Sequence, residues 1–234
     1  MKTSANGNGS SYEPGLASTE LRSYGRRRGR KPSDRQADLL RDLLPRVSLK
    51  VSDPPGLTPT QTWLEIGFGG GEHLVWQAAQ NPSVAFIGCE PFEDGVVKVL
   101  NKIDSDKLSN IQIHMGDARD VLRWLPEASV ARAFILFPDP WPKRKHRKRR
   151  LVNPQTLGQL AHVMKPGAEL RIGTDIADYA RTMLLAFQGA PEFQWQAESP
   201  QDWRIRPPDW PETRYEQKAQ REGRRRYYFR FLRL

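Results

Sequence analysis

The chain from residue 61 onward consists of short apolar runs separated by amphipathic segments. The runs have the length of strands and are rich in branched and aromatic side chains, which is typical of buried strands. They occupy residues 61–66, 84–90, 110–115, 130–137 and 168–174. In residues 72–80 and 93–103, apolar positions recur at the spacing of a helix. Strands that alternate with helices predict an α/β fold, with a parallel sheet covered by helices on both faces.

Two further segments near the end of the chain alternate apolar with polar residues. They are PEFQWQA, residues 191–197, and RRYYFRFLRL, residues 225–234. This period of two predicts partly exposed strands, which we expect to be antiparallel and to lie at the edge of the sheet.

The first sixty residues differ in composition from the rest. Residues 1–20 are rich in Ser, Gly and Asn, which predicts a disordered tail. A basic arm, LRSYGRRRGRK, follows, and a helix should begin at Ser33 because SDRQ has the capping-box form. Its apolar stripe consists of Leu39, Leu40, Leu43 and Leu44. We therefore expect a tail (1–20), a basic arm with a helix (21–60) and one α/β domain (61–234).

The positive charge of the chain is concentrated in three blocks. The formal net charge is +10, but residues 21–31, 143–150 and 221–234 carry +6, +7 and +5, so the remainder is net −8. A single charged run is usually a solvated face, whereas three basic runs on an acidic background favour a nucleic-acid partner.

Several classes of protein are disfavoured by composition. Cys89 is the one cysteine, so neither a disulfide framework nor a cysteine-rich zinc site is expected. The four histidines have no metal-ligand spacing, and no apolar run approaches the roughly 18–20 residues that a membrane span needs. The N-terminus lacks the apolar core of a secretory signal. We expect a cytoplasmic protein that needs no metal, no membrane and no obligatory protein partner.

Four successive strands are each followed by an acidic residue. Strand 61–66 contains Glu65 and runs into the glycine loop GFGGG, strand 84–90 ends at Glu90, and Asp117 and Asp139 follow the next two strands. Ligands of open α/β sheets bind outside the carboxyl ends of the strands, so these acids should meet at one edge. Asp117 could equally be a helix N-cap.

The acids and the glycine loop together favour a cationic ligand. The loop reads E-x-G-x-G-x-G, in which Gly67, Gly69 and Gly71 allow close backbone approach, but Glu65 would repel a dinucleotide pyrophosphate. S-adenosylmethionine (SAM) carries a sulfonium and an amino group, and a carboxylate such as Glu90 can accept both ribose hydroxyls. The pattern therefore favours SAM over NAD.

The stretch FPDPWPKRKHRKRR, residues 137–150, combines a stiff acidic turn with a basic run. The prolines fix φ and remove two backbone donors, so Asp139 is presented by a rigid loop. Trp141 offers a face for base stacking, although it could instead pack in the core. The run that follows suits a polyanion.

These stretches resemble the bacterial tRNA (guanine-N7)-methyltransferase family from about residue 22 onward. The resemblance rests on EIGFGGG, Glu90, GDA (116–118), FPDPWPKRKHRKRR, GTD (173–175) and TRYEQK (213–218). RSYGRRRGR also resembles the arginine-rich arm of that family. The resemblance implies a Rossmann-like SAM-dependent methyltransferase fold, a seven-stranded mostly parallel sheet with an antiparallel edge strand, and methylation of N7 of guanine 46 in tRNA.

The resemblance also implies roles for individual residues. Asp139 matches the catalytic position. The expected cofactor contacts are Glu65, Gly67, Gly69, Gly71, Glu90, Asp117, Ala118 and Asp139. The expected substrate contacts are Lys143, Asp175, Thr213, Arg214, Tyr215 and Glu216. The expected RNA contacts are Arg26, Arg27, Arg28, Lys145, His146, Arg147, Lys148, Arg149 and Arg150.

Other functions remain compatible with the sequence. A related enzyme with a Pro-rich loop could methylate another RNA, DNA or a protein glutamine. A basic RNA-binding module could retain the fold without binding SAM, and KRKHRKRR also resembles a nuclear-import run.

Overall fold

The computed structural model describes residues 32–52 and 61–234. The predicted tail (1–20) and the arm with Arg26, Arg27 and Arg28 lie outside the described residues. None of the described helices is long and apolar enough to cross a membrane.

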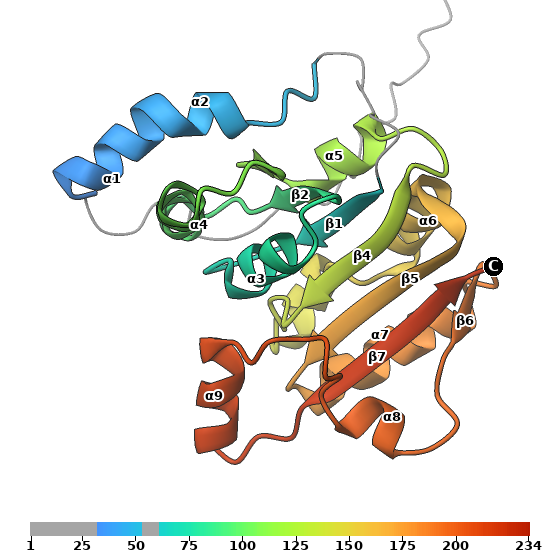
Figure 1. Cartoon of the computed structure of the whole chain (residues 1–234). Coiled ribbons are helices and arrows are strands. Elements are labelled where there is room, and N and C mark those ends of the chain that lie inside the picture. The colour runs from blue at the N-terminus through green and yellow to red at the C-terminus, as the bar shows by residue number, and fades with distance from the viewer. Residues whose placement is uncertain (1–31, 53–60) are drawn as a thin grey trace, which may run out of the picture.

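Seven strands form one sheet in the order β3-β2-β1-β4-β5-β7-β6 (Figure 1). Their bounds are Thr62–Ile66 (β1), Ala85–Cys89 (β2), Ile111–His114 (β3), Val130–Leu136 (β4), Met164–Thr174 (β5), Phe193–Trp195 (β6) and Tyr227–Arg233 (β7). Strands β1 to β5 are parallel, whereas β7 pairs antiparallel with both β5 and β6. The predicted α/β fold with a seven-stranded, mostly parallel sheet is confirmed.

The strand that runs against the others lies one place in from the edge. Of the two segments that we expected at the edge, β6 lies there and pairs antiparallel with its neighbour, whereas β7 is inserted between β5 and β6. Its side chains explain this position, because Tyr228, Phe229 and Phe231 are all buried and need cover that an edge does not provide. The edge strand β6 has three residues, and so short an edge resists pairing with other chains.

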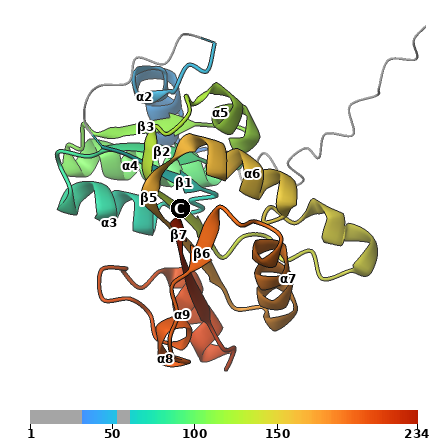
Figure 2. The ribbon, with the colours of Figure 1, turned by 90° about the vertical axis from the view of Figure 1, so that its right-hand side faces the viewer.

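Helices cover both faces of the sheet (Figure 2). Their bounds are Asp34–Asp38 (α1), Leu39–Leu43 (η1, a π-helical turn), Leu44–Val47 (α2), Glu72–Gln80 (α3), Glu93–Asp106 (α4), Ala118–Trp124 (α5), Arg144–Arg149 (η2, a 3-10 helix), Pro154–Val163 (α6), Ala177–Gln188 (α7), Gln201–Arg204 (α8) and Arg214–Arg221 (α9). Apolar residues of η1, α3 and α4 form one buried cluster, and those of α5, α6 and α7 form the other.

The N-terminal helix begins where the sequence predicts. Ser33 Oγ accepts a hydrogen bond from the Gln36 amide, and Gln36 Oε1 accepts one from the Ser33 amide. Leu39 is buried, and the other three leucines of the predicted stripe are partly buried against the α3–α4 cluster. The amphipathic stripe thus docks this helix beside α4.

Two helical glycines differ in the space around them. A Cβ on Gly95 in α4 would lie 2.3 Å from the carbonyl oxygen of Gly69, whereas a Cβ on Gly158 in α6 would meet nothing within 4 Å. Gly95 is therefore required for the close approach of α4 to the glycine loop, while Gly158 has no such role.

We predict opposite effects of alanine at these two positions. Gly158→Ala should raise the free energy of unfolding by about 0.5–1 kcal/mol, because it restricts the unfolded chain and adds no clash. Gly95→Ala should lower it by about 1–3 kcal/mol, since backbone must move. Urea unfolding followed by circular dichroism measures both free energies of unfolding. Destabilisation by Gly158→Ala would contradict the conclusion that Gly158 has no packing role.

Candidate active site

A pocket of about 260 Å³ opens at the carboxyl edge of the parallel strands. Residues from the loops after β1, β2, β3 and β4 line it, which is the convergence that the sequence predicts. The expected residues that line the pocket are Gly67, Gly69, Glu90, Asp117, Ala118, Asp139 and Arg149. Glu65 and Gly71 are not among its lining residues.

Glu90 fastens the glycine loop to the end of β2. Its Oε2 accepts a hydrogen bond from the Gly69 amide at 2.8 Å, and its Oε1 accepts one from the Phe92 amide at 3.0 Å. Burial raises the pKa of Glu90, against the lowering effect of these two amides. Each oxygen retains a further lone-pair direction for a ligand hydroxyl.

Gly71 serves packing. Its φ is +73°, and a Cβ there would lie 2.0 Å from Val99 Cγ2 on α4. Only glycine therefore allows α3 to begin this close to α4, which gives Gly71 a role in helix packing, and its expected contact with the cofactor stays a prediction.

Glu65, whose expected contact with the cofactor stays a prediction, is buried against helix α3. Glu65 is 3% exposed, and its Oε2 lies 2.7 Å from His73 Nδ1 on α3. His73 Nε2 lies 3.2 Å from Gln77 Nε2, which also donates to the Asp209 carbonyl at 2.9 Å. Since a buried carboxylate needs a partner, Glu65 binds α3 to β1 below the pocket floor.

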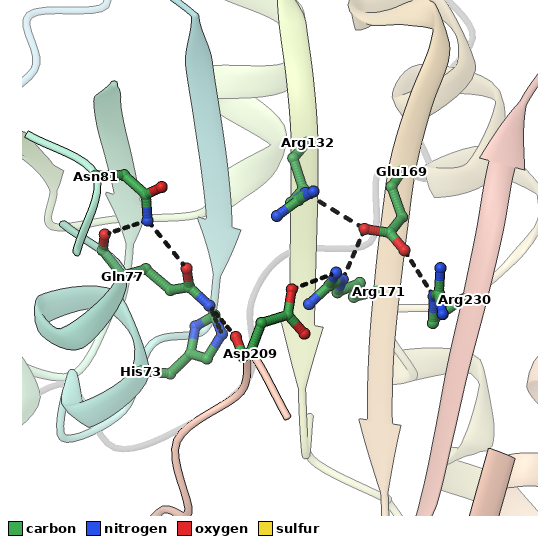
Figure 3. A network of polar contacts seen from close by, with 8 residues as sticks. All are labelled: His73, Gln77, Asn81, Arg132, Glu169, Arg171, Asp209 and Arg230. Carbon is green, nitrogen blue, oxygen red and sulfur yellow. Dashed lines mark hydrogen bonds and ion pairs between the residues drawn. The ribbon is translucent and has the colours of Figure 1, made fainter. Parts of the chain in front are cut away.

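The Glu65–His73–Gln77 chain continues across the sheet. Asp209 also pairs with Arg171 of β5 at 2.8 Å, and Arg171 shares Glu169 with neighbouring arginines, as Figure 3 shows. This polar network connects α3 to the loop that precedes α9. It therefore fixes the position of α9 relative to the glycine loop.

Asp117 has both of the roles that its sequence position suggests. It is the N-cap of α5, where Oδ1 accepts from the Arg119 amide at 3.0 Å, and Oδ2 accepts from Arg119 Nη1 at 2.7 Å. It also lines the pocket together with Arg119. Arg119 was not expected, because an arginine inside a helix carries no signal of facing a ligand.

The loop of Asp139 is held in an uncommon backbone conformation. Phe137 and Trp141, on either side of it, have φ values of +50° and +42°. The Phe137 amide donates to the Gly173 carbonyl at 2.7 Å, and Arg150 Nε donates to the Pro140 carbonyl at 2.9 Å. Burial raises the pKa of Asp139. The surrounding structure therefore holds the carboxylate at the pocket wall despite backbone strain.

The basic run separates into three groups of different surroundings. The side chains at 143, 144, 145, 147 and 148 are exposed, whereas His146 and Arg149 are partly buried. Arg150 is 2% exposed, and besides Pro140 it donates to Thr182 Oγ1 at 2.6 Å and Asp178 Oδ2 at 2.5 Å. Arg150 thus has a structural role, because its buried guanidinium is bonded to protein groups, and its expected contact with RNA stays a prediction.

Residues of the TRYE stretch lie at a second side of the site. Tyr215 packs its ring against Phe137, with centroids 5.2 Å apart, and its hydroxyl donates to Asp175 Oδ1 at 3.4 Å. Asp175 forms an ion pair with Arg224, which belongs to the third basic block, residues 221–234. The carboxylate of Asp175 and the tyrosine therefore form a small polar cluster beside the Asp139 loop.

The other members of this stretch hold α9 in place. Thr213 and Glu216 form a capping box, and Glu216 is 0% exposed and accepts from the Tyr228 hydroxyl at 2.8 Å. Arg214 pairs with Glu72 at the start of α3, next to which α9 lies (Figure 1). Glu216 is thus bonded within the protein, and its expected contact with substrate stays a prediction.

Among residues 32–52 and 61–234, no group of three or more His, Cys, Asp or Glu is arranged to hold a metal ion.

The strand order and the acid-lined pocket define the Rossmann-like methyltransferase class. A 16S rRNA methyltransferase, KamB, has the same fold, with a TM-score of 0.53 at 16% identity over 88% of this chain and 96% of that chain. An rRNA methylase from Streptococcus thermophilus gives a TM-score of 0.52 at 11% identity over 87% and 99%. At these identities the likeness concerns the fold alone.

Sequence comparison identifies the family. Residues 59–229 match a family described as "Putative methyltransferase". A tRNA (guanine-N(7)-)-methyltransferase of Roseobacter denitrificans is 53% identical over 77% of this chain and 78% of its own length. One of Zymomonas mobilis is 44% identical over 92% and 96%. The chain belongs to the tRNA (guanine-N7)-methyltransferase family.

The raised pKa of Glu90 predicts a pH-dependent affinity for a cationic ligand. Protonation removes the negative charge of Glu90, so affinity for SAM should be highest above this pKa and should fall as the pH decreases through it. Because the pKa is raised, the loss of affinity should begin at a higher pH than for a glutamate with the usual pKa of 4.5. Titration calorimetry from about pH 8 to about pH 5 measures the effect. Glu90→Gln should bind more weakly and show a smaller pH dependence, and a constant wild-type affinity would contradict the prediction.

Proposed function

We propose that this protein transfers the methyl group of SAM to N7 of guanine 46 in the variable loop of tRNA. The observation that carries the proposal is the position of Asp139 on the pocket wall, followed directly by five exposed basic side chains at positions 143, 144, 145, 147 and 148. The names of the relatives support the same reaction. A cytoplasmic site of action, where tRNA is available, follows from this substrate.

The pocket residues fit an adenosyl cofactor with a cationic end. Glu90, Asp117 and Asp139 supply negative charge around a space whose floor is the backbone of the glycine loop. Glu90 would accept the ribose hydroxyls, and Asp117 would accept hydrogen bonds at the end of the pocket that follows β3. When bound, SAM supplies an electrophilic methyl group on its sulfonium.

Asp139 orients the target base in this proposal. N7 of neutral guanine already carries an in-plane lone pair, so no residue has to remove a proton before the attack. The carboxylate can accept hydrogen bonds from N1–H and the exocyclic amine, and adenine offers no donor at N1. Asp139 thereby positions the base and stabilises the positive charge that develops on it.

The exposed lysines and arginines hold the RNA. Lys143, Lys145 and Lys148 are exposed, so they are accessible to phosphates. Phosphate contacts offset the free energy that is needed to unstack the target base. Tyr215 and Asp175 lie on the opposite side of the Asp139 loop, where they could contact the base or its ribose.

Incubation with SAM labelled on the methyl group tests the proposed reaction. Unmodified tRNA should acquire label, and nucleoside analysis should identify 7-methylguanosine at position 46. The same tRNA with adenine at position 46 is the control and should remain unlabelled. Label at another position or on another nucleoside would refute the proposed substrate.

Substitution of Asp139 should act mainly on turnover. We expect Asp139→Asn to lower kcat by roughly 10²–10³-fold, because the amide places a donor opposite the guanine donors. The affinity for SAM should weaken less. Glu127 is exposed, and Glu127→Gln serves as a control that should leave both kcat and the affinity for SAM unchanged. Near-normal turnover in Asp139→Asn would remove Asp139 from the mechanism.

A further inference from the structure

Arg149 differs from the other basic residues of the run in where its side chain lies. It is partly buried and lines the acid-lined pocket, whereas its neighbour Lys148 is exposed and Arg150 is buried against Asp178. The guanidinium carbon of Arg149 lies 4.9 Å from the centroid of the Trp141 ring, and Trp141 lines the same pocket. The ring face that we expected to stack on a base is thus in contact with an arginine.

Arg149 is one of several residues after β4 that line the pocket. Leu151, two residues further on, also lines it and packs against the buried cluster of α5, α6 and α7. The Asp117–Arg119 turn at the start of α5 lines the same pocket. Arg149 therefore belongs to the wall of the pocket in which we propose that SAM binds.

Charge restricts which part of the cofactor an arginine can meet. The sulfonium and amino groups of SAM are positive and would repel an arginine, whereas its carboxylate and its neutral adenine ring offer acceptors. The planar guanidinium can both donate to ring nitrogens and stack on an aromatic face. Because the guanidinium of Arg149 already stacks on the Trp141 ring, the planar adenine suits it better than the carboxylate does.

We propose that Arg149 binds the adenine ring of the cofactor and closes the adenosyl end of the pocket together with Trp141. The inference rests on the proposed use of SAM, and it moves Arg149 from the RNA contacts to the cofactor contacts. The basic run then has three functions: exposed side chains for RNA, Arg149 for the cofactor, and Arg150 for the loop of Asp139.

The test measures ligand affinity without turnover. The probes are S-adenosylhomocysteine and 5′-methylthioadenosine, and each is titrated by calorimetry in the absence of tRNA. Only the second probe lacks the amino and carboxylate groups. Arg149→Met should raise the Kd of both probes by about tenfold, the effect of one charge-assisted hydrogen bond. Its Kd for tRNA, measured by filter binding, should change by less than about twofold.

Two further variants complete the design. Lys148→Met is the matched control: it should weaken tRNA binding and leave both adenosyl probes unchanged. Arg149→Lys retains the charge but lacks the planar group, so it should lose affinity for the probes about as much as Arg149→Met does. Urea unfolding of each variant confirms that the fold is intact.

The possible contrary results are distinct. If Arg149→Met weakens the binding of S-adenosylhomocysteine but not that of 5′-methylthioadenosine, Arg149 contacts the carboxylate of the homocysteine group. The assignment of Arg149 to adenine is then refuted. If it weakens tRNA binding as Lys148→Met does and leaves the probes unchanged, Arg149 is an RNA contact. Failure of the wild-type protein to bind either probe would instead refute the proposed use of SAM.

Discussion

The parallel direction of β1, β2, β3 and β4 is the constraint on which the site depends. Parallel strands end at one edge, so Glu90, Asp117 and Asp139, which follow β2, β3 and β4, are delivered to the same region without any long-range sequence signal. The hydrogen bond from the Gly69 amide to Glu90 then joins two of these loops at 2.8 Å. Because the loop glycines have positive φ, they turn the backbone tightly enough for this contact. The pocket floor is thus formed by backbone before any ligand arrives.

Local patterns in the sequence were sufficient to predict the helices and strands but not the order of the strands in the sheet. The predicted helices 72–80 and 93–103 correspond to α3 and α4, and most predicted strands agree with the structure to within two residues. Strand β5 begins at Met164 and is longer than expected. Its first residues include Pro166 and Gly167, which are poor strand formers, so the sequence pattern did not indicate a strand there. The place of β7 inside the sheet could not be predicted, because pairing of strands depends on contacts that a period of two does not encode.

Burial of charged residues is the main feature of the site that the sequence did not indicate. Glu65, Arg150 and Glu216 all lie in motifs rich in functional residues, yet each is buried and bonded to protein groups. A sequence shows that a residue is charged, whereas its role depends on whether water or protein surrounds it. His73 and Gln77, among the buried residues of α3, were the available signal for a buried polar contact to Glu65.

Arg150 gives a physical reason why the acidic turn and the basic run are adjacent. Its guanidinium spans the Pro140 carbonyl and Asp178 of α7, so the last residue of the run holds the loop that contains Asp139. Hydrogen bonds from a charged donor contribute about 1.5–3 kcal/mol each, enough to offset the roughly 1–3 kcal/mol of strain at each of the two left-handed residues beside Asp139. A lysine at this position could not reach several acceptors in one plane. The run must therefore follow the turn within a few residues, because one of its arginines holds the turn in shape while the exposed ones project toward solvent.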